Sequence, residues 1–434
     1  MMTTTVDNAK QPEVMRTYCA DNASANSLPC SVLSIESPLV HISDFSLSRL
    51  PRIEFGPGVL GKLPAIARIY GTRALLVTGA GSLKNSPRWA AVTDGLQAQG
   101  VSWLHLAIPG EPSPQRVDEA VRTLRLESID VVIGLGGGSA LDAAKAIAGL
   151  LKPGNSVLDH LEGVGPELAY TGPATPFIAV PTTAGTGSEA TKNAVLSVQG
   201  SDGFKKSFRD EKLVADVALV DPDLLASCPA AVIAANGMDA FTQLLESFVS
   251  CRAAPLTDSL AWGGMKAARD GLLALHADAG DAAARNRMAY AALVSGITLA
   301  QVGLGSVHGL AAPLGAFFPI PHGVACGTLV AQATRANIEA LQARAANHPA
   351  LGKYAQVGRL LSRQGQLNQL ASHAVLIDTL DAWTRELQLP ALAHYGVTHA
   401  DIPRIVANSR GSSMKTNPID LTDAEIAGIL AARI

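Results

Sequence analysis

The stretch Asp130–Leu151, DVVIGLGGGSALDAAKAIAGLL, decides the fold of the N-terminal half of the chain. Its apolar, β-branched beginning predicts a buried strand, and SALDAAKAIAGLL predicts a helix. Between the two, glycines let backbone N–H groups approach a phosphate, and the helix N-terminus adds a favourable dipole. The turn lacks the GxGxxG pattern, and a tight turn that binds no ligand is the alternative. The candidate ligand-binding residues of this turn are Gly137, Gly138, Ser139 and Asp142.

The segments around this stretch repeat the same alternation of strand and helix. Short apolar runs at 73–79, 101–108 and 176–181 predict strands, whereas 87–100 and 114–127 have the apolar spacing of helices. Such alternation is typical of a mostly parallel sheet with helices on both faces. We therefore expect an α/β domain that binds a dinucleotide.

After Asp221 the sequence becomes rich in Ala and Leu and predicts helices without further strands. We expect a loosely ordered N-terminal extension over 1–45, the dinucleotide-binding α/β domain over 46–225 and an all-helical metal and substrate domain over 226–434. A cleft between the two domains is a favoured place for a ligand site.

Composition narrows the function classes. Of the 434 residues, 48% are apolar and 16% are charged, as expected for a globular chain. The net charge of −3 and the pI of about 6.4 give no sign of a nucleic-acid-binding surface. No uncharged apolar run of 18 residues predicts a membrane span, and the N-terminus does not resemble a secretory signal. The five scattered cysteines indicate a reducing compartment, so we expect a cytoplasmic protein.

Two further Gly- and Thr-rich loops follow predicted strands. Ligands of open α/β sheets bind at the carboxyl ends of strands, so both loops are candidate cofactor sites. The first, PTTAGTGSEATKN, offers Thr182, Thr183, Thr191 and Asn193. The second, LLVTGAGSLKNS, offers Gly79, Ser82 and Lys84. It has no acidic residue to repel a 2′-phosphate, which favours NADP over NAD, although Lys84 could equally be a solvated surface lysine.

A candidate metal site comes from two distant segments. In NGMDAFTQLLESF, Asp239 and Gln243 are four residues apart and share one helix face. In SVHGLAAPLGAFFPIPHGVACG, His308 and His322 are each followed by glycine. Together these four side chains could hold Fe(II) or Zn(II) with a position open for substrate oxygen. Alternatively, Asp239 is a surface carboxylate and the two histidines are buried, hydrogen-bonded core residues.

These segments occur in a recognisable order. Three more segments belong to the same order: FGPGVLGKLP, ALVDPDLLASCP and SMKTNPIDLTDAEIAGIL. Together, all these segments make residues from about 45 to 434 resemble the iron-containing (group III) alcohol dehydrogenase family. The resemblance implies a dinucleotide-binding domain, a helical metal-binding domain and hydride transfer to NAD or NADP. It places cofactor contacts at Gly138, Ser139, Thr182, Thr191, Asn193 and Lys205.

The chain departs from the family pattern at two positions. The family metal is usually held by one Asp and three His, and three of these match as Asp239, His308 and His322. Gln243 stands where the remaining His is expected, and Ala312 stands where the family has a His near the nicotinamide. Without that imidazole, release of the alcohol proton would depend on water or on the cofactor ribose.

The resemblance predicts a metal-dependent alcohol dehydrogenase or aldehyde reductase. Asp239, His308 and His322 would act in catalysis through the metal, Phe317 and Ala312 would shape the substrate pocket, and the protein would be a homodimer. One alternative is an enzyme of the dehydroquinate synthase or glycerol dehydrogenase kind on the same scaffold. The other is a non-catalytic nucleotide-binding relative.

Overall fold

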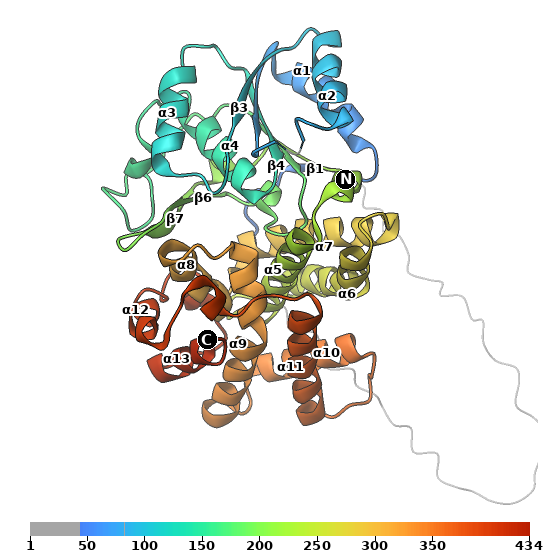
Figure 1. Ribbon diagram of the computed structural model, residues 1–434, viewed down its shortest axis with the longest axis vertical. Helices are drawn as coiled ribbons and strands as arrows, with labels where there is room; N and C mark the ends of the chain where they lie inside the picture. Colours follow the sequence, from blue (N-terminus) through green and yellow to red (C-terminus); the bar gives the residue numbers. More distant parts are fainter. Residues whose placement is uncertain (1–43, 82) are drawn as a thin grey trace, which may run out of the picture. The chain divides into compact units, whose positions relative to one another are not determined.

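A six-stranded, fully parallel sheet organises the N-terminal half of the chain (Figure 1). The computed structural model describes residues 44–81 and 83–434, which fall in one compact unit. Of the predicted extension over 1–45, only residues 44 and 45 are described. The predicted cofactor residue Ser82 lies outside the described residues. The strands are β1 (Arg52–Phe55), β2 (Arg73–Thr78), β3 (Ser102–Ala107), β4 (Val131–Gly136), β5 (Phe177–Pro181) and β8 (Val217–Val220). They lie in the order β1-β8-β5-β4-β2-β3.

Helices cover both faces of this sheet. On one face, Leu63 and Val92 share a buried apolar cluster with Ile133 of β4, and on the other Leu141 shares one with Val132. Every residue of β4 and β5 is buried, as expected of strands covered on both faces. The helices are α1 (Leu63–Tyr70), α2 (Pro87–Ala98), α3 (Pro114–Leu124) and α4 (Gly138–Leu150). The predicted fold class of this half is confirmed.

An antiparallel hairpin that the sequence did not predict follows β5. It consists of β6 (Asn193–Val198) and β7 (Phe204–Arg209). Its Phe208 packs close to α4, where a Cβ added to Gly149 would lie 3.1 Å from the phenyl ring. Strand β7 also contacts helix α8 (Ser306–Phe317), so the hairpin joins the α/β half to the helical half.

The C-terminal half is helical, as predicted, and surrounds a central helix. The longer helices are α5 (Ala230–Val249), α6 (Pro255–Ala277), α7 (Ala282–Val302), α8, α9 (His322–Arg344), α10 (Pro349–Ser362) and α11 (Gln369–Glu386). The short helices α12 (Ile402–Ala407) and α13 (Asp423–Ala431) follow. Helix α5 packs against α6, α7 and α9 and is buried on almost every side, so its sequence is mostly apolar and its polar residues Asp239, Gln243 and Glu246 lie inside the protein.

No single helix of the described residues is long and apolar enough to cross a membrane. Helices α7 and α8 meet the criteria of length and composition only when taken together, and they are bent by 100° at the break between them. Most residues of both helices are buried within the helical core.

Candidate metal centre and cofactor cleft

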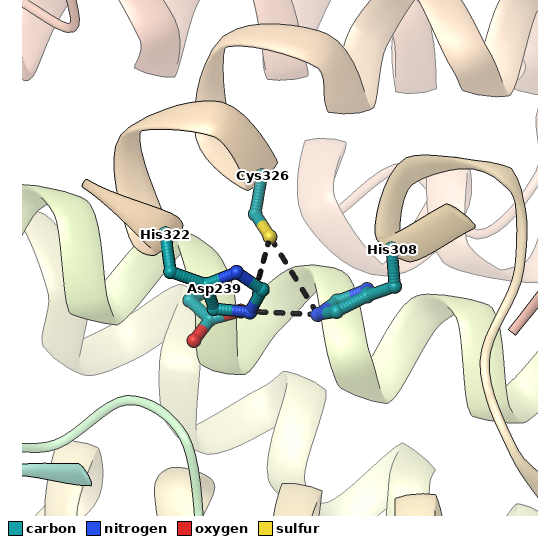
Figure 2. Close-up of side chains that lie close together, drawn as sticks. All are labelled: Asp239, His308, His322 and Cys326. Atoms are coloured by element: carbon teal, nitrogen blue, oxygen red, sulfur yellow. Dashed lines mark hydrogen bonds and ion pairs between the residues drawn. The ribbon is translucent and has the colours of Figure 1, made fainter. Parts of the chain in front are cut away.

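Three helices bring together four side chains of types that can bind a metal (Figure 2). Asp239 projects from the middle of α5, and His308 lies in the first turn of α8. His322 begins α9, and Cys326 follows one turn later on the same helix face. Helices α9 and α5 can approach this closely because Gly323 has no Cβ. A Cβ at that position would lie only 2.4 Å from the carbonyl oxygen of Ala235 on α5. This close packing explains why a glycine follows His322.

The four donor atoms lie within 4.8 Å of one another. Nε2 of His308 is 3.2 Å and Nε2 of His322 is 3.8 Å from Oδ1 of Asp239. Sγ of Cys326 is 3.6 Å from Nε2 of His308 and 3.8 Å from Nε2 of His322. Two imidazoles, a carboxylate and a thiol at these separations can chelate a single ion.

The buried carboxylate of this cluster is incompletely paired. Asp239 is fully buried, and its Oδ2 has no hydrogen-bond partner among the described residues. A buried carboxylate oxygen without a partner is costly, because water no longer solvates it. A divalent cation between Asp239 and the imidazoles would satisfy that charge, so the donor set fits a metal.

The titration of the cluster follows from burial and mutual charge. Burial raises the pKa of Asp239, but His322 and His308 outweigh it and lower that pKa to about 2. Burial lowers the pKa of His322 to about 4, which leaves a neutral imidazole at pH 7. Burial also lowers the pKa of His308, but Cys326, Asp239 and Glu246 raise it well above its ordinary value. Burial raises the pKa of the Cys326 thiol to about 12. An ionised carboxylate and a neutral imidazole are the protonation states that bind a divalent ion.

A cavity of about 940 Å³ connects this cluster to the sheet. Its size suits an extended ligand, and its lining comes from both halves of the chain. On the α/β side it reaches the Gly137 turn at the N-terminus of α4, and on the helical side it reaches Asp239 and both histidines. An anionic group at α4 and a metal-bound substrate could thus share one space.

The matches to known proteins follow the same two halves. Residues 51–222 match the family model for iron-containing alcohol dehydrogenases, and residues 233–434 match the model for the C-terminal part of that family. The chain belongs to the iron-containing alcohol dehydrogenase family. This membership confirms the predicted enzyme class and the predicted pairing of NAD(P) with a divalent metal.

Relatives of this alcohol dehydrogenase cover most of its length. The probable alcohol dehydrogenase EutG of Escherichia coli is 32% identical over 382 residues, which are 87% of this chain and 91% of that protein. Lactaldehyde reductase of Escherichia coli is 32% identical over 360 residues, 81% of this chain and 89% of that protein. The structure of the archaeal Red Sea brine pool alcohol dehydrogenase ADH/D1 gives a TM-score of 0.82 at 28% identity. That match covers 91% of this chain and 100% of the other.

The cavity of this alcohol dehydrogenase is lined by most of the residues that the sequence singled out. The predicted cofactor residues that line it are Gly79, Gly137, Gly138, Ser139, Asp142, Thr183, Thr191, Asn193 and Lys205. Asp239, Gln243, His308, His322 and Ala312 line it too. Thr182 and Lys84 are not among the lining residues, and the Thr182 backbone bonds Gly136 and Cys228 instead. Phe317 also lies outside the lining, and the Arg404 guanidinium stacks 3.7 Å from its ring centroid.

Gln243 faces a partner on a neighbouring helix. It lies one turn after Asp239 on α5 and is buried. Its carbonyl oxygen accepts a hydrogen bond of 2.8 Å from the hydroxyl of Ser295 on α7. The side-chain atom that could bind a metal is therefore already hydrogen-bonded to α7.

Glu246 is a functional residue that the sequence analysis missed. Its Oε2 accepts a 2.6 Å hydrogen bond from Nδ1 of His308, and its Oε1 accepts one of 2.7 Å from the backbone of Val307. A carboxylate on Nδ1 fixes the ring and directs Nε2 towards the cluster. The signal was available, because Glu246 lies seven residues after Asp239 and so returns to the same helix face.

Lys145 was also missed, although it organises the cofactor loop. It is a fully buried residue of α4, and its ammonium donates to the Ser188 and Asn193 carbonyls and to the Thr191 hydroxyl. Burial lowers the pKa of Lys145 to about 8. One buried cation thus holds both ends of the segment from Ser188 to Asn193 against α4.

Lys205, predicted to contact the cofactor, is ion-paired at the cavity wall. Its ammonium lies 2.5 Å from Oε1 of Glu111, whose Oε2 accepts a hydrogen bond from Ser197. Both Lys205 and Glu111 line the cavity. Because Glu111 neutralises the lysine, the pair presents a dipole to a ligand rather than a free positive charge.

Proposed function

We propose that this protein transfers hydride between NADP or NAD and an alcohol or aldehyde bound at the metal cluster. One observation carries the proposal. The buried and incompletely paired Asp239 meets two imidazoles in the same cavity that reaches the glycine turn of α4. A metal-bound substrate and a dinucleotide phosphate would therefore occupy two ends of one space.

Asp239, His308 and His322 would hold the divalent ion, for which Fe and Zn are the candidates. When bound, the ion polarises the C–O bond of the substrate, while the nicotinamide carries the hydride. Glu246 keeps the Nε2 lone pair of His308 directed at the ion through its hydrogen bond to Nδ1. The buried apolar core around α5 excludes water from the far side of the cluster.

Gly137, Gly138 and Ser139 would receive the dinucleotide phosphates at the N-terminus of α4. Gly79 follows β2 and faces open space, since an added Cβ would meet no atom within 4 Å. That space leaves room for a 2′-phosphate, so we propose a preference for NADPH over NADH. Thr183, Thr191 and Asn193 complete the wall on the β5 side, with Asp142 and Lys205 nearby.

Ala312 lies one turn after His308 on α8 and lines the cavity. A methyl group there leaves space beside the metal cluster and offers no proton relay. We therefore propose substrates larger than ethanol. Activity confined to two- and three-carbon alcohols and aldehydes would contradict this proposal.

Net turnover of the nicotinamide cofactor tests the function. Purified protein is supplied with Fe²⁺, Zn²⁺ or Mn²⁺, and oxidation of NADPH and NADH is followed across a series of aldehydes of increasing chain length. We expect aldehyde-dependent oxidation with at least one ion, and faster oxidation of NADPH than of NADH. Tight NADPH binding without turnover under any of these conditions would instead favour a non-catalytic relative.

We further propose a homodimer, as the family resemblance implies, a cytoplasmic location, as the scattered cysteines suggest, and a domain boundary near residue 225, where the sequence becomes helical. Light scattering coupled to size-exclusion chromatography measures the mass in solution against the 44.8 kDa of one chain. Limited proteolysis followed by mass spectrometry locates the boundary. A mass of one chain would contradict the dimer.

A further inference from the structure

The metal site of this protein lacks one donor of the family pattern, and the structure offers a different one. Asp239, His308 and His322 supply three donors. Gln243, at the fourth position of the pattern, bonds Ser295 through its carbonyl oxygen. Cys326, which no motif singled out, lies within the cluster instead (Figure 2).

Cys326 lies in the buried core of the helical half, but its sulfur faces the cluster. It is fully buried one turn after His322 on α9, so the two side chains leave the helix on the same face. Its Sγ lies 3.6 Å from Nε2 of His308 and 3.8 Å from Nε2 of His322. The sulfur thus faces the ligating nitrogen of both imidazoles.

The separations are close to those of ligands that share one ion. Bonds of about 2.0 Å to nitrogen or oxygen and about 2.3 Å to sulfur, at roughly tetrahedral angles, place the donor atoms about 3.3–3.5 Å apart. Of the separations among the donor atoms of Asp239, His308, His322 and Cys326, four run from 3.2 to 3.8 Å, and all are within 4.8 Å. Small adjustments of the four side chains therefore bring them to one ion.

We propose that Cys326 is the fourth protein ligand of the metal, in place of the histidine that the family has at position 243, and that substrate oxygen takes a fifth position. The inference rests on the metal site of the proposed function. As the sulfur–metal bond forms, the S–H bond breaks and its proton leaves to solvent. A soft thiolate beside two imidazoles favours Zn²⁺ over Fe²⁺, so the site is a zinc site.

Cobalt substitution tests the sulfur directly, independently of activity. The full-length protein is stripped of metal under anaerobic conditions and titrated with Co²⁺, and separately with Zn²⁺. We expect one ion per chain and a thiolate-to-cobalt charge-transfer band in the near ultraviolet. Cys326→Ser and Cys326→Ala should lose that band and weaken Zn²⁺ binding by about 100-fold or more, since even outer-shell partners are worth about 10- to 100-fold.

Two further variants make the test specific. Cys251→Ser changes an exposed free cysteine and should leave the cobalt band and the Zn²⁺ affinity unchanged. Adding Gln243→His to Cys326→Ser should restore metal binding without the thiolate band, because the missing imidazole returns. Circular dichroism and thermal unfolding verify that each variant is folded.

The outcomes separate this inference from the proposed function. Stoichiometric Co²⁺ binding without a thiolate band, retained by Cys326→Ser, would overturn the role of Cys326 and leave the metal site standing. A wild-type protein that binds neither Co²⁺ nor Zn²⁺ would overturn both.

Discussion

The cofactor turn and the metal cluster line the same cavity but depend on opposite properties of their residues. The turn depends on the absence of a side chain at Gly138, because an added Cβ would lie 2.7 Å from Oγ1 of Thr186. The cluster works because specific side-chain atoms are present, and Asp239 is fully buried to supply one of them. Added atoms should therefore damage the turn, and removed charges should damage the cluster.

Asp239→Asn tests the cluster most severely. The amide keeps the shape but removes the negative charge that a divalent ion requires. We expect kcat/KM for aldehyde reduction to fall by about 10³-fold or more, because metal catalysis is worth several kcal/mol. Metal content, measured by mass spectrometry, should fall in parallel, and full metal occupancy with full activity would contradict the assignment.

A pH series tests Glu189, a buried carboxyl group in the loop that follows β5. Glu189 is buried, and burial raises its pKa from 4.5 to about 7. The folded state thus binds this proton more tightly than the unfolded state. Its stabilising contribution is complete below pH 4.5 and is lost as the pH rises through 7. The loss amounts to at most about 3 kcal/mol, at about 1.4 kcal/mol per pKa unit.

Glu189→Gln removes this titration. The variant should lack the decline in the free energy of unfolding between pH 4.5 and 7, measured by chemical denaturation at each pH. If wild type and variant have parallel pH profiles over that range, Glu189 does not titrate as described.

Gly138→Ala tests the turn by adding one methyl group. Thr186 must move to accept it, and such overpacking costs about 1–3 kcal/mol. We expect the KM for NADPH to rise by about 10- to 100-fold while metal content is unchanged. Gly352→Ala on α10 is the matched control, because its Cβ would enter open space away from the cavity lining and should change that KM less than about threefold. Equal effects of the two variants would contradict the comparison.

Glu246→Gln tests the support of the cluster. The amide is a weaker acceptor for Nδ1 of His308, so the ring is held less firmly with Nε2 directed at the ion. We expect Zn²⁺ affinity to fall by about tenfold, within the range for outer-shell partners, as measured by competition with a chelator. An unchanged affinity would show that the core alone positions His308.

Sequence patterns predicted the continuous parts of the molecule. The buried strands β2, β4 and β5 and the helices α2, α3 and α4 follow apolar runs whose period is local. The four-residue strands β1 and β8 went unnoticed, because each is too short to establish a period and is held by pairing with the other. The β6–β7 hairpin was missed for a related reason, since its position depends on packing against α4 and α8.

The residues of the candidate site likewise fall into those that a local motif identifies and those that only packing reveals. Asp239, His308 and His322 could be named because each lies in a distinctive motif. Cys326 and Glu246 were missed, because the helix-face spacing that relates them to His322 and Asp239 does not by itself distinguish a ligand or its support from a core residue.

Local patterns and the order of the motifs determined the family, the parallel sheet, the helical half and three of the candidate ligands, because these depend on local spacing and residue type. Only the tertiary structure decided which fourth side chain reaches the cluster. Helix packing turns Gln243 towards Ser295 and brings Cys326 within 3.8 Å of both imidazoles. Distances between residues on different helices are set by how the helices pack, and no spacing along the chain encodes them.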